Sequence, residues 1–492
     1  MKRILPALLL GAAVFVVYHS VLALGLLGHD TYPILLTSRI QNPADLLHDF
    51  TRILMDGRYP ASFYRPLLCL SLALDQALFG LDPLPYQFEN LLFFAASAVA
   101  LFYLVRRMAG PGARIAPWAA ALAFLLFPLQ YEVLPVVGRR PETMAFLFTT
   151  LSILAVLSPR NLARSRPGLL AGFLALLAIL SKETGFLVVP LSFLAVLVMT
   201  DRSGGSARIR HAARAALPQA AAAILLILVR WGVIGGLGGH ADAGLSNLAN
   251  LPVFARRLLF PQIPMADSPW GLPLVLGLGA ALLATLLLAA PRFERMRAGF
   301  FAAFWTLLML AVHAWSGTSP WYLLFSAAGF AFFLGVALEG SFRILRSQGR
   351  VARRLSAAVS GLLISALLLW QASYSPLFHS YPEWELADRL RKDVLQGVGA
   401  VIEKAQPGSR LGPFELPAQV TAWKKPGYRE AMLYGASILR SYSVQAWAEI
   451  RFPEKAVEVR SVEPEEPLPP EVADRIQVLF VERYVIPKGE SR

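Results

Sequence analysis

The chain has 492 residues, of which 56% are hydrophobic and 16% are charged. Soluble domains average about 25% charged residues, so this composition excludes an ordinary soluble protein and indicates a polytopic membrane protein. The net charge of +14 does not indicate nucleic-acid binding, because most of the excess Lys and Arg falls in short loops between apolar runs. Cys69 is the only cysteine, which excludes an intrachain disulfide and a thiolate metal cluster.

The first apolar run, residues 4–27, follows Lys2 and Arg3. A cleaved signal peptide is one interpretation, but the run is long for one and has no clear A-x-A cleavage site. A retained membrane helix with its amino end inside is therefore favoured. The polar stretch that follows, His29–Pro66, would then lie outside the membrane.

Asp30 lies within one or two residues of the predicted membrane boundary. A carboxylate at that depth is partly desolvated, which raises its pKa and suits it to accept a proton from a hydroxyl group. The alternative is that Asp30 only caps a helix that begins near Pro33. Taken alone, the aspartate favours the capping role.

Two helices that lie in the membrane interface are predicted in the external loop 28–85. Pro43–Asp56 places its apolar residues on one helical face and its acids on the other. A second interface helix is expected at Arg65–Phe79, with Asp75 facing the water. A third is predicted at 251–261, in a later external loop.

The alternation of apolar runs with Arg-rich loops predicts roughly eleven spans and places the carboxyl end outside. After the first run, the expected spans are 86–105, 115–135, 142–157, 168–180, 184–199, 215–234, 271–290, 298–315, 321–338 and 356–374. The two short spans, 168–180 and 184–199, could instead form one kinked hairpin, which would preserve the topology.

Residues 377–492 are predicted to form a soluble, extracytoplasmic domain of small α/β type. An amphipathic helix is expected at 384–405, and strands are expected at 456–462 and 476–481. The domain contains no catalytic constellation. Its expected role is that of a structural cap or an acceptor-binding surface.

Charged residues gather at the predicted outer ends of the membrane helices. Carboxylates there could handle a hydroxyl proton, and cations could hold a phosphate. The alternative for each residue is a headgroup anchor or an ion pair that joins two helices, and this alternative is favoured for Arg139 and Arg140. The outer charged residues are His29, Asp30, Arg65, Glu132, Arg139, Arg140, Lys182, Glu183 and Arg230.

Four stretches resemble membrane glycosyltransferases of the GT-C superfamily. They begin with FYRPLLCL (residues 63–107), FPLQYEVLPVVGRRPE (127–148), LLAILSKETGF (176–194) and SPWYLLFSAAG (319–338). The nearest group is the O-mannosyltransferases that carry tetratricopeptide repeats, with their bacterial relatives. Protein O-mannosyltransferases and lipid A aminoarabinose transferases are more distant. The resemblance covers about residues 1–376.

The resemblance implies a GT-C-like transmembrane domain, 1–376, in the inner membrane of a bacterium. Its implied reaction is an inverting single displacement that moves a sugar from a polyprenyl phosphate to a protein, lipid or glycan acceptor on the extracytoplasmic face. No cofactor is implied, and the interface helices would form the wall past which the lipid tail enters. The implied roles are base for Asp30, second acid for Glu132, and substrate binding for His29, Arg65, Arg139, Lys182 and Arg230.

The chain departs from the family's pattern at several positions. Relatives often have paired acids where this chain has His29-Asp30, which leaves open metal assistance and the identity of the base. Histidines of some relatives are replaced by Gln87, Glu89 and Gln130, and an arginine by Trp321. No tetratricopeptide repeats follow, so the sugar and the acceptor are not implied.

Two other functions are compatible with the sequence. A transporter or lipid flippase without transferase activity is one alternative, but it predicts paired halves and charges near the membrane midplane, whereas no internal repeat is evident. A non-catalytic assembly protein that keeps the same scaffold is the other.

Overall fold

The structure is a computed structural model. It describes residues 4–58, 63–158, 168–200, 205–236, 244–261, 293–316, 319–347, 351–379, 381–415, 419–420, 436–437, 439–462 and 485–486.

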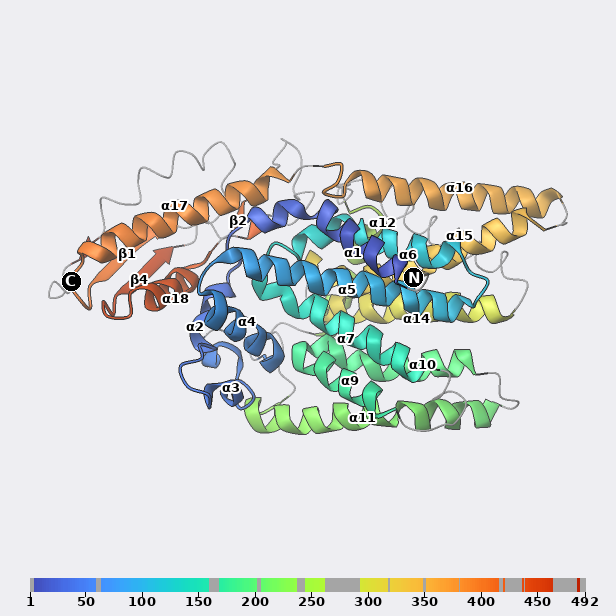
Figure 1. Cartoon of the computed structure of the whole chain (residues 1–492), viewed down its shortest axis with the longest axis horizontal. Helices are drawn as coiled ribbons and strands as arrows, with labels where there is room; N and C mark the ends of the chain where they lie inside the picture. Colours follow the sequence, from blue (N-terminus) through green and yellow to red (C-terminus); the bar gives the residue numbers. More distant parts are fainter. Residues whose placement is uncertain are drawn as a thin grey trace.

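Apolar helices lie side by side in a bundle, and a smaller α/β part covers one end of it (Figure 1). The α-helices of the bundle and its loops are α1 (Leu5–Val17), α2 (Thr31–Thr37), α3 (Asp45–His48), α4 (Pro66–Phe79), α5 (Pro83–Ala109), α6 (Ile115–Leu125), α7 (Arg140–Val156), α9 (Leu169–Ser181), α10 (Val188–Met199), α11 (Gly205–Ile234), α12 (Leu251–Leu259), α14 (Phe293–Ser316), α15 (Leu324–Leu345) and α16 (Val351–Ser373). Short 3₁₀ turns are η1 (His19–Ala23), η2 (Leu54–Gly57), η3 (Pro128–Glu132), η4 (Val137–Arg139), η5 (Glu183–Leu187), η6 (Leu245–Asn250) and η7 (Pro320–Leu323).

Five described helical segments are long and apolar enough to cross a membrane: Pro83–Ala109, Gly205–Ile234, Arg297–Ser316, Trp321–Leu345 and Val351–Ser373. Five shorter apolar helices accompany them: Leu5–Val17, Pro66–Phe79, Ile115–Leu125, Leu169–Ser181 and Glu183–Met199. Every span predicted from the sequence overlaps a helix, apart from 271–290, which lies outside the described residues. The chain is therefore a multi-pass membrane protein whose membrane part is helical.

Two predicted spans are shorter than expected. The run predicted as a helix over 4–27 is α-helical only over Leu5–Val17 and is followed by the 3₁₀ turn η1. The helix predicted over 115–135 ends at Leu125, and the chain continues into the 3₁₀ turn η3. Phe127 precedes Pro128 and has an extended backbone (φ −66°, ψ 121°), as steric conflict with the proline ring favours. The break brings Glu132 to the end of the bundle, beyond the helix.

The predicted interface helix Pro43–Asp56 is wrong. Within it only Asp45–His48 is α-helical, and Met55 and Asp56 have left-handed backbones (φ 57° and 55°). The Asp45 carboxylate accepts hydrogen bonds from two backbone amides that precede it, at 2.8 and 2.7 Å, which ties the chain into a local turn. Within the segment, the amide of Leu54 donates to the carbonyl of Phe63 at 2.8 Å instead of to a helical carbonyl. Periodicity does not report such a pairing with a later part of the chain.

A helix, α4, is present where the second interface helix was predicted, but its orientation differs from the prediction. Asp75 is 2% exposed rather than facing water. Its Oδ2 lies 2.7 Å from Nη2 of Arg140, which comes from α7. Asp75 therefore faces the interior because it pairs with a buried cation on the neighbouring helix α7.

The carboxyl-terminal part combines helices and strands. Its elements are α17 (Pro382–Lys404), β1 (Arg410–Glu415), β2 (Gln419–Val420), β3 (Ala436–Ser437), α18 (Ser441–Arg451), β4 (Glu458–Val462) and β5 (Val485–Ile486). The three-stranded sheet has the order β4-β1-β5, with β1 parallel to β4 and antiparallel to β5. This confirms the predicted α/β class and the predicted helix and first strand, while the strand predicted at 476–481 lies outside the described residues.

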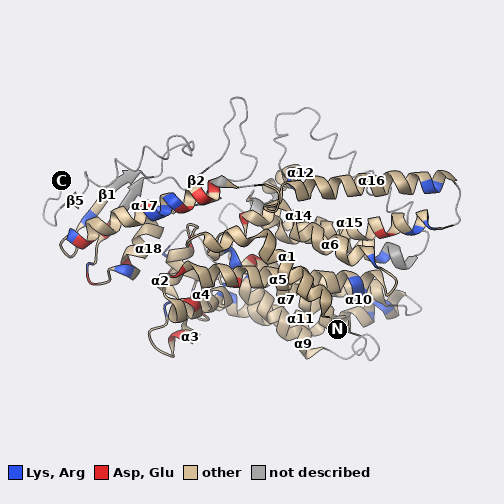
Figure 2. Cartoon of the chain, turned by 45° about the horizontal axis from the view of Figure 1, so that its top comes forward, with Lys and Arg blue, Asp and Glu red and all other residues tan. Residues whose placement is uncertain are grey.

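The two ends of the bundle differ in their surroundings. The carboxyl-terminal part packs on one end, where α18 contacts α2. Lys and Arg mark the opposite ends of α15 and α16, away from α17 and α18 (Figure 2). This distribution is the one that the positive-inside rule associates with a cytoplasmic end.

Candidate functional site

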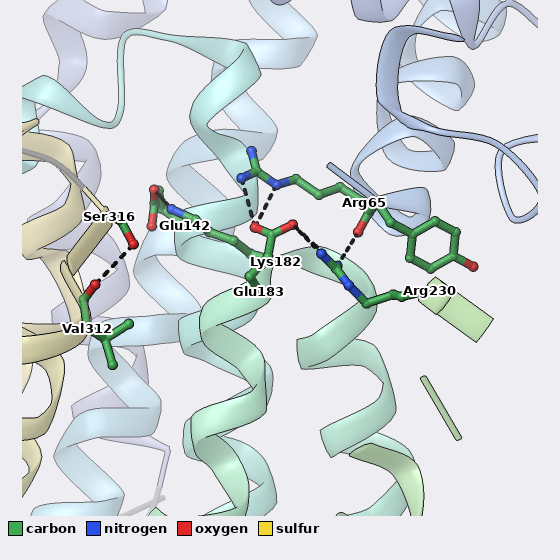
Figure 3. Close-up of polar contacts among 8 residues, drawn as sticks. Arg65, Glu142, Lys182, Glu183, Arg230, Val312 and Ser316 are labelled. Atoms are coloured by element: carbon green, nitrogen blue, oxygen red, sulfur yellow. Dashed lines mark hydrogen bonds and ion pairs between the residues drawn. The ribbon is translucent and has the colours of Figure 1, made fainter. Parts of the chain in front are cut away.

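Glu183 joins two arginines that come from distant segments (Figure 3). Its Oε2 accepts hydrogen bonds from Nη2 and Nε of Arg65, at 2.8 and 3.1 Å. Its Oε1 lies 3.4 Å from Nη1 of Arg230, which also donates to the carbonyl of Tyr64 at 3.2 Å. Arg230 is only 1% exposed, so Glu183 compensates a cation buried in the apolar helix α11.

Lys182 pairs with a different acid, Glu142, at the start of α7. Both side chains are buried, and the Lys182 ammonium also lies 4.8 Å from the ring centroid of Tyr322. Glu183 is adjacent to Lys182 in the sequence, yet the ion pair of Lys182 is formed with Glu142 on the neighbouring helix α7.

Local backbone geometry explains why neighbouring residues have different partners. Helix α9 ends at Ser181, and Lys182 has an extended backbone (φ −161°, ψ 155°). The amide of Gly185 then donates to the Lys182 carbonyl at 2.9 Å and closes a tight turn. A Cβ on Gly185 would overlap the backbone of Ala178, so only glycine fits this return against α9.

Arg139 and Glu132 form a second ion pair beside this group. The Arg139 guanidinium lies 3.7 Å from Oε2 of Glu132, donates to the Glu132 carbonyl, and stacks 3.7 Å from the ring centroid of Trp321. Glu132 is fully buried, and its carboxylate oxygens have no hydrogen-bond partner within the described part of the chain. The pair therefore holds a buried charge with unused hydrogen-bonding capacity.

Asp30 occupies the position before α2, but its side chain makes no capping hydrogen bond. Its Oδ1 instead accepts a hydrogen bond from the hydroxyl of Tyr442 at 3.2 Å. Asp30 is an exposed residue, yet the surrounding protein removes enough water from its carboxyl to raise the pKa above its usual value, against the opposing effects of Tyr442, Arg65, Arg139 and Arg440. The capping interpretation thus lacks its expected contact, and the carboxylate is more basic than an ordinary aspartate.

The neighbouring His29 is half-buried, and its carbonyl accepts a hydrogen bond from the hydroxyl of Ser443. The structure thus connects His29 through its backbone to the carboxyl-terminal part.

Arg140 is a structural residue. It is 1% exposed, and all three guanidinium nitrogens donate hydrogen bonds. Its partners are Asp75 (2.7 Å), Asn90 (2.8 Å), Glu89 (2.9 Å), the Tyr86 carbonyl (3.1 Å) and Ser71 (3.2 Å). Such saturation leaves no guanidinium donor for a substrate.

Two acids that pair with these cations had no predicted role. Glu142 was expected only to begin a span, and Glu183 was expected among the outer charged residues without a role in binding or catalysis. Their positions could have identified both acids as partners of the cations, because each acid follows a cation at a predicted outer helix end. Within the described residues, no three His, Cys, Asp or Glu side chains gather in a group that could hold a metal ion.

Comparisons with known proteins give a likeness in fold. No protein-family model and no curated protein matches the sequence. Solved structures similar to the chain include ArnT from Cupriavidus metallidurans bound to undecaprenyl phosphate, with 13% identity, a TM-score of 0.46, and coverage of 94% of this chain and 90% of that one. The apo state of the same protein has 15% identity, a TM-score of 0.47, and coverage of 93% and 90%.

Proposed function

We propose that the chain is a GT-C-type glycosyltransferase of the bacterial inner membrane. It would move a sugar from a polyprenyl phosphate to a protein, lipid or glycan acceptor on the extracytoplasmic face. One observation supports this most directly. Each of the four family-like stretches contributes residues to one polar cluster, which consists of the ion pairs of Glu183, Lys182 and Glu132 and the aromatic rings beside them. The contributed residues are Arg65 from the first, Glu132, Arg139 and Glu142 from the second, Lys182 and Glu183 from the third, and Trp321 and Tyr322 from the fourth.

The cations of this cluster suit a phosphate leaving group. Arg65, Lys182 and Arg230 outnumber Glu142 and Glu183 by one positive charge. A phosphodiester donor carries one negative charge, and a second develops as its bond to the sugar breaks. Cations fixed by neighbouring carboxylates therefore stabilise the transition state more than the bound donor.

The proposed step balances without a cofactor. Asp30 accepts the proton of an acceptor hydroxyl, whose oxygen forms a bond to the anomeric carbon of the sugar. The bond from that carbon to the phosphate oxygen breaks on the opposite face, and the electron pair leaves with the polyprenyl phosphate. The configuration at the anomeric carbon is inverted.

Glu132 and Arg139 are proposed to bind substrate beside the reacting atoms. Their ion pair at 3.7 Å is long, and the Glu132 carboxylate has unused hydrogen-bonding capacity. A sugar hydroxyl could take up that capacity, with Glu132 acting as the second acid. His29 would contribute to the same region, and α4 would line the path of the lipid tail.

Purified protein supplied with a labelled polyprenyl-phosphate sugar tests the proposal. Transfer of the label with release of polyprenyl phosphate, measured by mass spectrometry, is the expected result. Movement of the labelled lipid across a vesicle membrane without any transfer would support a flippase instead. Donor binding without transfer or movement, across a panel of acceptors, would favour a non-catalytic assembly protein.

A further inference from the structure

A short segment that carries the proposed base is held from one side by helix α17. Asp388 on α17 accepts a hydrogen bond from the amide of Gly25 at 2.9 Å, and Arg391 donates to the hydroxyl of Tyr32 at 3.4 Å. Arg391 packs so closely on Gly25 that a Cβ there would overlap the guanidinium. A larger residue at this position would displace the Arg391 guanidinium from its place beside Gly25.

Helix α18 holds the same segment at its centre. The Tyr442 hydroxyl donates to Oδ1 of Asp30 at 3.2 Å, and the Ser443 hydroxyl donates to the carbonyl of His29. Ser443 is itself fixed, because its oxygen accepts a hydrogen bond from the amide of Arg440 at 3.1 Å in the first turn of α18. Two consecutive residues of the carboxyl-terminal part thus contact two consecutive residues of the membrane part.

These contacts orient a carboxylate that has few other fixed partners. Arg65, Arg139 and Arg440 face Asp30 electrostatically, and no hydrogen bond from any of the three to its carboxylate is present among the described residues. Within the part of the chain that the structure describes, the Tyr442 hydroxyl is the side-chain group that donates a hydrogen bond to it. Its contact selects one orientation of the carboxylate and favours the charged form.

We propose that the carboxyl-terminal part completes the active site, with Tyr442 as the positioning residue for the Asp30 carboxylate and Ser443 as the residue that fixes its backbone. This inference rests on the proposed function, in which Asp30 is the base. It assigns the domain a role in the chemistry beyond that of a cover or an acceptor surface. The domain and the membrane part would therefore be catalytically interdependent.

The test is the pH dependence of turnover in Tyr442→Phe. Turnover requires ionised Asp30, so it falls as the pH drops through the pKa of that carboxyl. Loss of the tyrosine hydrogen bond destabilises the ionised form of Asp30. The acidic limb of the pH profile of turnover should therefore move to higher pH by about 0.5–1 unit. At pH values below the pKa of Asp30, turnover of Tyr442→Phe should be about 3- to 10-fold lower than that of the wild type. Turnover should recover at high pH, and donor affinity should be unchanged.

Glu449→Gln is the matched control, because Glu449 lies on α18 and contacts Arg58 at 3.5 Å without touching Asp30. This variant should leave the limb in place. An unmoved limb in Tyr442→Phe, with only a lower melting temperature, would overturn the inference. The proposed base has a separate test, since Asp30→Asn with normal turnover would refute it whatever Tyr442 does.

Ser443 provides a second, independent variant. Ser443→Ala should lower turnover at every pH, and Ser443→Thr, which keeps the hydroxyl, should restore it. Circular dichroism and melting temperature would verify that α18 is intact in both. Equal turnover in the two folded variants would remove Ser443 from the positioning role.

Discussion

At the scale of single residues, the choice of partner decides which charges are available for chemistry. Arg140 is saturated by its neighbours, whereas Asp30 has one hydroxyl donor and part of its surface in contact with solvent. Arg139 and Arg140 are adjacent in sequence, yet one stacks on Trp321 and the other is enclosed between helices. A charged residue that is buried and whose hydrogen-bond donors are all used by the protein is therefore structural, whereas one with donors or acceptors left for a ligand is a candidate site residue.

Asp30→Asn should abolish most turnover while donor binding survives. The substitution preserves size and removes the base, and general-base catalysis contributes about 10²- to 10⁴-fold. In the wild type, turnover should fall as pH decreases through a pKa above the usual aspartate value, since desolvation raises it. If the residue only capped α2, stability would instead fall by about 0.5–2 kcal/mol with the chemistry intact.

Lys182 has two roles that a double variant can separate. Lys182→Met should weaken donor binding about 10- to 100-fold and should also destabilise the protein by about 3–5 kcal/mol, because it leaves Glu142 buried and unpaired. Adding Glu142→Gln should restore much of the stability and none of the donor affinity. Binding and melting temperature measured on both variants would check this, and recovery of both properties together would make Lys182 purely structural.

At the scale of elements, one buried cation joins three helices. Arg140 of α7 bonds to Asp75 and Ser71 of α4 and to Glu89 and Asn90 of α5. The contacts fix α4 against the bundle and thereby position Arg65, which directly precedes α4. The network is thus a structural support for the proposed phosphate site.

Arg140→Met should lower the free energy of unfolding by about 3–5 kcal/mol, because Asp75 would remain as a buried, unpaired charge. Adding Asp75→Asn should recover part of that loss. Donor affinity per folded molecule should fall only slightly, because α4 would hold Arg65 less firmly while Arg65 keeps its pair with Glu183. A large affinity loss at full stability would show that Arg140 contacts the donor.

At the scale of the whole molecule, the proposed site and the carboxyl-terminal part share one end of the bundle. The division at residue 376 stays a prediction, and the structure places the end of α16 at Ser373 and the start of α17 at Pro382. Lys and Arg at the far ends of α15 and α16 favour a cytoplasmic location for that side (Figure 2).

Reporter fusions test this orientation. Alkaline phosphatase fused after residue 400 should be active, because the carboxyl-terminal part would be extracytoplasmic. A fusion near Arg210 should be inactive, because the amino end of α11 would face the cytoplasm. The opposite pattern would invert the proposed topology and move the site to the cytoplasmic side.

The sequence by itself determined the membrane class and nearly every helix, because long apolar runs and Arg-rich loops follow from the local requirements of the bilayer. It also predicted that Asp30, Glu132, Arg139, Lys182 and Arg230 lie at one end. Local patterns failed at Pro43–Asp56, where the backbone turns left-handed at Met55 and Asp56 and the amide of Leu54 pairs with the carbonyl of Phe63.

Only the tertiary structure decided the pairing of charges. Lys182 reaches Glu142 rather than adjacent Glu183, and Tyr442 meets Asp30 across 412 residues of chain. Periodicity reports which face of a helix is apolar, but it carries no information on which polar group another segment brings to that face. Desolvation and partner geometry, which determine whether a charge supports the fold or acts on a substrate, exist only once the helices have packed.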